Sequence, residues 1–208
     1  MAGAGGRNAP RLHNECGGGI RNFEKIGAGV DVLPLLLELQ RQPQLWNRND
    51  ARLSEHGPHW QTDDIWLRYK DEAENKASGS YANFGDEHDP IWYPAFYSLP
   101  SARKLIFDLM ARINGERLGG ILIYRIAPRK EILPHTDTGW HVEYYDKFNI
   151  SVKSQPGCTF FYEDEAMNAQ TGDVYWYVNH KPHWVRNESA DDHIVLTVSI
   201  KTHKYRSL

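Results

Sequence analysis

The amino-acid sequence predicts an α+β fold that is mainly β, a β-sandwich or jelly roll with helices packed on one face. Helix patterns precede residue 118, and a series of short strand patterns separated by turn residues follows it. The 208 residues, 40% of them hydrophobic, suffice for one domain with a substantial core. We expect a flexible, Gly-rich arm over residues 1–19 and a single domain over 20–208, with a helical and strand support (20–118) and a β core (119–203).

The support is expected to contain two helices and one strand. The run DVLPLLLEL, residues 31–39, predicts a short helix with Asp31 as its N-cap. A second helix is expected over residues 98–114, where apolar residues recur at the helical period. Between them, DDIWLRYK (63–70) alternates like a strand, and the polar stretch 71–90 reads as a surface excursion.

The core after Gly119-Gly120 is expected to consist of strands, because short alternating or apolar runs are divided by Pro, Gly and Asn-Asp turn signals. The expected strands are GILIYRIAP (120–128), EILPHTD (131–137), FNISVKS (148–154), CTFFYED (158–164), DVYWYVN (173–179), HWVRN (183–187) and HIVLTVSIKTH (193–203).

Charge and cysteine content exclude several classes of function. A net charge of -3 argues against nucleic acid or a membrane surface as a partner, since both require a basic face. The two cysteines form no CxxC motif, so neither a zinc ribbon nor a disulfide framework is indicated. The N-terminus lacks an apolar signal region, and no run reaches the roughly 18 apolar residues of a membrane span. A cytoplasmic protein with no evident obligate protein partner is the expectation.

The motif HTD, residues 135–137, predicts a metal site. On a strand, residues i and i+2 face the same side, so His135 and Asp137 can present a nitrogen and an oxygen to one cation. A second histidine would complete the 2-His-1-carboxylate set that holds non-haem Fe(II) and leaves three coordination positions open. His183 is the choice for that ligand because it begins the strand HWVRN after an antiparallel partner. The other candidates are His141, His180, His193 and His203.

These motifs resemble those of a known enzyme group. HTD, GDVYWYVNHKPHWVRNES and HIVLTVSI are similar to the catalytic half of the Fe(II)/2-oxoglutarate oxygenases, and more narrowly to the aspartyl/asparaginyl β-hydroxylase-like group, over residues 120–201. The resemblance implies a double-stranded β-helix with His135, Asp137 and His183 as iron ligands. It also implies 2-oxoglutarate as co-substrate, O₂ as oxidant, and hydroxylation of an amino-acid side chain (free or in a peptide) or a related small molecule, with release of succinate and CO₂.

The anchor for the far carboxylate of 2-oxoglutarate departs from the pattern of the resembled group. That group places a basic residue about ten positions after the distal histidine, where this chain has His193. Lys153, which shares a strand face with Asn149, is the alternative source of positive charge, and the Tyr124 phenol is a further donor. His193, Tyr124, Asn149 and Lys153 are therefore the expected co-substrate residues.

The substrate is expected near the segment that follows HTD. Trp140, His141 and Tyr145 lie there on a loop or bulged strand, and such loops line the mouths of jelly-roll sites. Arg125, like Arg52 and Arg68, could receive an anionic substrate or be an ordinary surface charge.

Two other functions stay open at this point. One is a cupin-like metalloenzyme without 2-oxoglutarate, although cupins carry more histidines in two separate motifs. The other is a metal-binding jelly roll without activity, which the presence of all three ligand types disfavours.

Overall fold

The computed structural model describes residues 11–12, 21–49, 51–52, 57–80 and 85–205. Its helices are α1 (Leu33–Arg41), the 3-10 turn η1 (Pro43–Leu45), α2 (Ala73–Ser78), α3 (Pro94–Ser98), α4 (Pro100–Arg112) and α5 (Trp140–Tyr144). Its strands are β1 (Arg11–Leu12), β2 (Phe23–Gly27), β3 (Thr62–Tyr69), β4 (Ile91–Trp92), β5 (Arg117–Ile126), β6 (Glu131–His135), β7 (Asp146–Lys153), β8 (Cys158–Tyr162), β9 (Glu165–Met167), β10 (Val174–Tyr177), β11 (His183–Asn187) and β12 (His193–Lys201).

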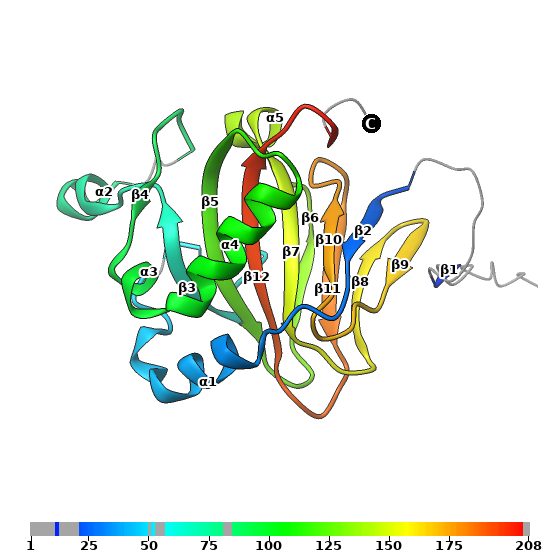
Figure 1. Ribbon diagram of the computed structural model, residues 1–208. Coiled ribbons are helices and arrows are strands. Elements are labelled where there is room, and N and C mark those ends of the chain that lie inside the picture. Colours follow the sequence, from blue (N-terminus) through cyan, green and yellow to red (C-terminus); the bar gives the residue numbers. More distant parts are fainter. Residues whose placement is uncertain (1–10, 13–20, 50, 53–56, 81–84, 206–208) are drawn as a thin grey trace, which may run out of the picture.

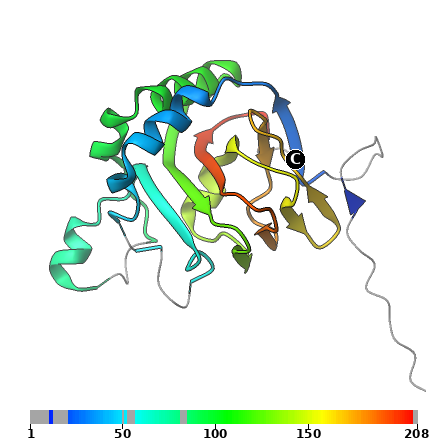
Figure 2. The same cartoon turned by 90° about the horizontal axis from the view of Figure 1, so that it is seen from below.

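Two facing sheets form the core of the molecule (Figures 1 and 2). The larger has the order β2-β10-β7-β12-β5-β3-β4 and the smaller has the order β1-β9-β8-β11-β6. From β5 onward the chain alternates between them, so that β5, β7, β10 and β12 lie in the larger sheet and β6, β8, β9 and β11 in the smaller. This strand connectivity is that of a jelly roll, or double-stranded β-helix. The predicted fold class is confirmed.

The helices α1, α3 and α4 lie against the outer face of the larger sheet (Figure 1). Strand alternation explains this arrangement, because on β7 the side chains of one face are apolar and buried. On β7, Phe148, Ile150 and Val152 are buried on one face, while Lys147 and Asn149 point to the barrel interior. Within the described residues, none of the helices has the length and apolar character needed to cross a membrane.

Most expected elements are present with shifted ends. The first helix covers Leu33–Arg41 and its N-cap is Val32 rather than the expected Asp31, although the Asp31 carboxylate accepts a hydrogen bond from the Leu33 amide. The second expected helix is present as α4, two residues shorter at each end, and a separate short helix, α3, ends at Ser98 just before it. Proline cannot donate a backbone hydrogen bond, so it begins a helix rather than continuing one.

The sequence patterns missed four strands, the helices α2, α3 and α5, and the 3-10 turn η1. β1, β2, β4 and β9 are short or lie outside the β core, and the segment 140–144 forms the short helix α5 instead of a bulged strand. The Gly-rich arm falls mostly outside the described residues; of it, only Arg11–Leu12 is described, and this pair of residues forms a parallel ladder with β9.

Candidate active site

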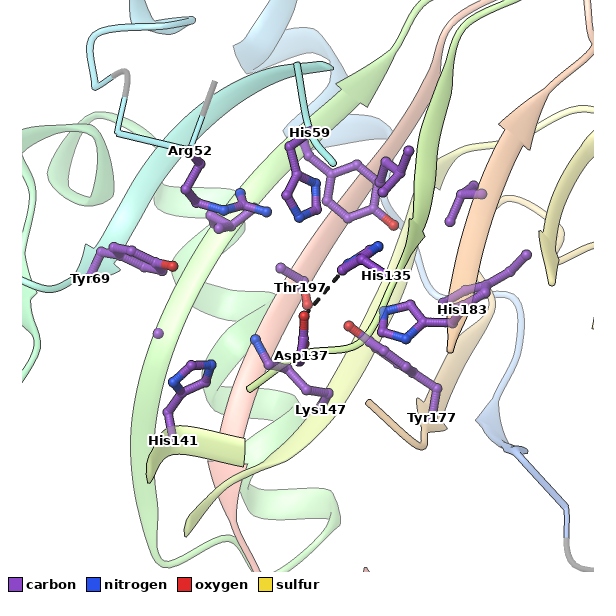
Figure 3. A pocket seen from close by; sticks show the side chains of 16 residues that line it. Arg52, His59, Tyr69, His135, Asp137, His141, Lys147, Tyr177, His183 and Thr197 are labelled. Atoms are coloured by element: carbon purple, nitrogen blue, oxygen red, sulfur yellow. Dashed lines mark ion pairs between the residues drawn. The ribbon is translucent and has the colours of Figure 1, made fainter. Parts of the chain in front are cut away.

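Three side chains that can bind a metal meet at one end of the barrel. His183, the first residue of β11, lies directly opposite His135, the last residue of β6, in the antiparallel ladder. Asp137 follows β6, and its amide donates to the Asn179 carbonyl, which fixes the turn. Ligand atoms of the three residues all lie within 4.8 Å of one another, and His135 Nε2 is 3.6 Å from Asp137 Oδ1. Figure 3 shows the three side chains pointing toward a common centre.

Backbone hydrogen bonds orient both imidazoles in the same way. Nδ1 of His135 lies 2.8 Å from the Leu133 carbonyl, and Nδ1 of His183 lies 2.8 Å from the Lys181 carbonyl. A carbonyl can only accept, so each Nδ1 carries the proton and each Nε2 keeps its lone pair. This is how proteins orient histidine ligands of metals. The donor set of two Nε2 atoms and one carboxylate therefore fits a divalent transition metal of the Fe(II) type.

The electrostatics of the three groups suit metal binding. Burial would raise the pKa of Asp137, but the charges of Lys147 and the nearby histidines outweigh it, so that the pKa lies below its ordinary value. Burial lowers the pKa of His183, against the opposing effect of Asp137. At neutral pH the carboxylate is thus ionised and the His183 imidazole neutral, which are the forms that coordinate a cation.

A cavity of about 100 Å³ opens in front of the three ligands. Its walls come from both sheets: Tyr124 of β5, Lys147 of β7, Phe160 of β8 and Tyr177 of β10 all line it. Asp137 is the single carboxylate among the described lining residues. The cavity therefore differs from a cation site built from several carboxylates, because basic side chains line it beside the single carboxylate of the metal ligands.

Two basic side chains reach this cavity. Arg52 donates to Asp64 Oδ2 at 2.5 Å, and Asp64 is fully buried, so the guanidinium charge is balanced within the protein. Lys147 forms no ion pair within the described residues, although Asp137 acts favourably on its charge. Burial lowers the pKa of Lys147 and Asp137 opposes that shift. Among the described residues, Lys147 is thus a cavity cation without an ion-pair partner.

The expected co-substrate residues are not all in this cavity. Tyr124 lines it. Asn149 is buried and donates to the Tyr175 hydroxyl, and Lys153 pairs with Asp191 at 2.7 Å. His193 is buried and its Nδ1 lies 3.2 Å from the Lys153 carbonyl; burial lowers its pKa to about 4, so the ring is neutral at pH 7. None of Asn149, Lys153 and His193 lines the metal cavity, and their roles stay predictions.

The expected substrate residues divide in a similar way. His141 lines the metal cavity and also a neighbouring one, of which Trp140 and Tyr145 form part of the wall. Arg125 lines neither of these two cavities. It donates two hydrogen bonds to Asp63 and lies over the Trp46 ring at 4.6 Å.

Gly119 of β5 allows the Tyr145 ring, which lines the neighbouring cavity, to pack closely against the strand. A Cβ atom at this position would lie 2.9 Å from three carbons of the Tyr145 ring. We expect Gly119→Ala to destabilise the protein by about 1–3 kcal/mol, because a buried ring and a strand must then separate. Chemical denaturation would measure this change. Gly85→Ala is the matched control, since a Cβ there meets nothing within 4 Å, and equal losses in both variants would contradict the prediction.

Sequence patterns gave no role to three residues that line the metal cavity. His59 lies before β3, and its ring centroid is 5.0 Å from that of His135. Thr197 lies on β12, where it belongs to an apolar run. Lys147 shares the strand parity of Asn149 and Lys153, a signal that makes it a candidate but does not select it over Lys153.

Comparison with known proteins agrees with this geometry. Residues 36–203 match the sequence model of the family described as Aspartyl/Asparaginyl beta-hydroxylase. No curated protein matches the chain. Among solved structures, an oxidoreductase of the 2OG-Fe(II) oxygenase family from Burkholderia pseudomallei is similar at 17% identity and TM-score 0.57, over 94% of this chain and 96% of that one.

Two further structures have a similar fold. A prolyl hydroxylase from Trichoplax adhaerens, in complex with a peptide of the hypoxia inducible factor oxygen degradation domain, has 11% identity and TM-score 0.57, over 90% of this chain and 87% of that one. A prolyl-4-hydroxylase from Pseudomonas putida has 12% identity and TM-score 0.50, over 88% and 94%. At these identities the likeness concerns the fold. The family model, in contrast, matches more than half of the sequence, and the chain belongs to the aspartyl/asparaginyl beta-hydroxylase family.

Proposed function

We propose that this protein is an Fe(II)- and 2-oxoglutarate-dependent dioxygenase that hydroxylates an amino-acid side chain, free or in a peptide, or a related small molecule. The observation that carries the proposal is the 2-His-1-carboxylate cluster of His135, Asp137 and His183 inside a jelly roll of a hydroxylase family. These three residues would hold the iron. When bound together, ferrous iron and 2-oxoglutarate supply the chemistry that converts a substrate C–H bond to C–OH.

The overall reaction consumes one O₂ and one 2-oxoglutarate. One oxygen atom enters the substrate as a hydroxyl group and the other enters succinate, while the bond to the departing carboxyl group of 2-oxoglutarate breaks and CO₂ leaves. The protein's own part is to orient the reactants and exclude water. The walls formed by Phe160 and Tyr177 and the buried Thr197 would serve that purpose around the metal.

The charge of the cavity supports a dianionic co-substrate. Asp137 and Lys147 carry opposite charges, and Asp64 balances Arg52. A divalent ion therefore leaves two uncompensated positive charges, and buried charges are costly unless they are paired. 2-Oxoglutarate, with two carboxylates, neutralises both. We propose that one carboxylate lies at the metal and that Lys147 pairs with the other.

The direct test is the conversion of 2-oxoglutarate to succinate. Purified protein with Fe(II), 2-oxoglutarate and O₂ is expected to form succinate, slowly without substrate, and removal of iron with a chelator should stop the reaction. Succinate would be quantified by mass spectrometry, with chelated protein re-supplied with Fe(II) as the control. Iron binding without consumption of 2-oxoglutarate would contradict the proposal and favour a cupin-like metalloenzyme.

A further inference from the structure

A second cavity adjoins the metal cavity. It has a volume of about 110 Å³, and four residues line both cavities: Tyr69, Gly120, His141 and Lys147. Gly120 leaves the junction open, because a Cβ atom there would already lie 3.3 Å from the Tyr69 ring. None of the three metal ligands lines this side cavity, so it meets the metal cavity at these four shared residues.

Aromatic rings that pack against one another form much of the wall of the side cavity. The Trp140 indole donates to the Asp86 carbonyl at 3.0 Å and its ring centroid lies 5.8 Å from that of Tyr145. His88 packs edge-on against Trp140 at 5.4 Å, and Tyr69 closes the side toward β5. Rings fixed in this way give a preformed apolar surface, which is what small-molecule sites use to bind the body of a ligand.

The charges around the side cavity indicate an uncharged occupant. Among its described lining residues there is no carboxylate to receive a cationic group. Lys147 is the cation shared with the metal cavity, and with iron and 2-oxoglutarate bound its charge is already balanced. Lys70 also lines the cavity, but it has an interaction partner within the protein. An anionic group would thus lose its hydration, and the two lysines that could receive it already have interactions of their own.

We propose that the side cavity binds an uncharged, branched aliphatic side chain of the substrate and presents one of its C–H bonds to the metal. The size agrees, because an apolar protein cavity of about 150 Å³ holds one benzene molecule, and 110 Å³ suits a group slightly smaller than that ring. This inference rests on the proposed function. It narrows the substrate from any amino-acid side chain to leucine-like ones, and in the reaction an aliphatic C–H of that side chain becomes C–OH while O₂ and 2-oxoglutarate are consumed.

Three probes of nearly equal shape test the proposal. The probes are N-acetyl-leucinamide, N-acetyl-asparaginamide and the α-amide of N-acetyl-aspartate, which keeps its side-chain carboxylate. They differ mainly in the polarity and charge of the side chain, and their capped ends carry no charge. Their Kd values would be measured by calorimetry under nitrogen on protein loaded with Fe(II) and 2-oxoglutarate. The leucine probe is expected to bind at least about tenfold tighter than the aspartate probe. Burial of its isobutyl group is favourable, whereas the carboxylate of the aspartate probe must lose its hydration on binding. In air, the leucine probe should gain the mass of one oxygen atom.

Two variants locate the binding. Trp140→Ala is expected to weaken the leucine probe about tenfold or more, and Trp140→Phe to restore most of the affinity. Tyr97→Ala, which truncates an aromatic side chain 62% exposed on α3, is the control and should bind like the wild type. Tighter binding of the aspartate probe, no binding of any probe, or equal binding to the Trp140 variants overturns the proposal. Because the Kd values do not depend on turnover, such a result is distinct from a failure to form succinate.

Discussion

Replacing His183 with leucine is expected to abolish iron binding. The rate of iron-dependent turnover should therefore fall by more than about 100-fold. Loss of a first ligand should exceed the 10- to 100-fold effects seen when groups that only orient a ligand are removed. Leucine is chosen because the His183 side chain is buried among the rings of Phe160, Tyr162 and Tyr177, so that an alanine would add a cavity to the loss of the ligand. Iron per protein chain, measured after anaerobic reconstitution, and succinate formation are the two readouts.

The matched control is His180→Leu in the turn before β11. His180 is exposed and is not part of the metal cavity, so its variant should keep full iron content and activity. Asp137→Ala should behave like His183→Leu, because it removes the single carboxylate of the donor set. If His180→Leu loses its iron while His183→Leu keeps it, then the distal ligand has been assigned to the wrong histidine.

The ligand cluster could be predicted from the sequence because it follows from strand geometry. Alternation alone predicted that His135 and Asp137 face the same side. In the structure β6 ends at His135 and Asp137 lies two residues beyond it, yet the two side chains still meet. The distal histidine was selected because His183 begins a late strand, with the preceding YWY strand as its expected antiparallel partner. That pairing is wrong, since β11 pairs with β6 and β8 while β10 lies in the other sheet, but the ladder with β6 places His183 opposite His135. The same local signals also predicted the positions of most core strands along the chain, with errors of a few residues at their ends.

The remaining walls of the cavity could not be predicted in this way. Arg52 and His59 belong to a segment before β3 that has no regular periodicity, and only the folded chain brings them to β5 and β6. The buried Asp64 that balances Arg52 looks, in the sequence, like one of several surface acids. Long-range charge pairing of this kind leaves no pattern along the chain, so the cation that faces the metal could not be selected by spacing.

The lysines of β7 illustrate the limit most clearly. Lys147 and Lys153 lie on the same face of one strand, so parity cannot separate them. They are six positions apart, which corresponds to about 20 Å along an extended chain. The ladder decides between them: Lys147 lies opposite Tyr177, a residue of the metal cavity, while Lys153 lies opposite Ile194 and pairs with Asp191.

Replacing Lys147 with methionine is therefore expected to weaken binding of 2-oxoglutarate by roughly 10- to 150-fold. A hydrogen bond to a charged group contributes about 1.5–3 kcal/mol, which corresponds to this range of Kd. Calorimetry of 2-oxoglutarate binding to Fe(II)-loaded protein under nitrogen measures the effect without turnover. The free energy of unfolding without ligands should stay the same or rise, since the change removes a partly buried charge that has no ion-pair partner among the described residues.

Lys153→Met is the matched control on the same strand, and it is expected to leave the Kd within a fewfold. His193→Ala should also have little effect if Lys147 is the anchor, because a neutral imidazole with a pKa of about 4 brings no charge to the carboxylate at pH 7. A loss of affinity confined to Lys153→Met or His193→Ala would instead move the anchor to the far end of β7, as strand parity and the resembled group suggest. If none of the three substitutions changes the Kd, the two positive charges left by the metal are neutralised by something other than 2-oxoglutarate, and the proposed reaction fails with them.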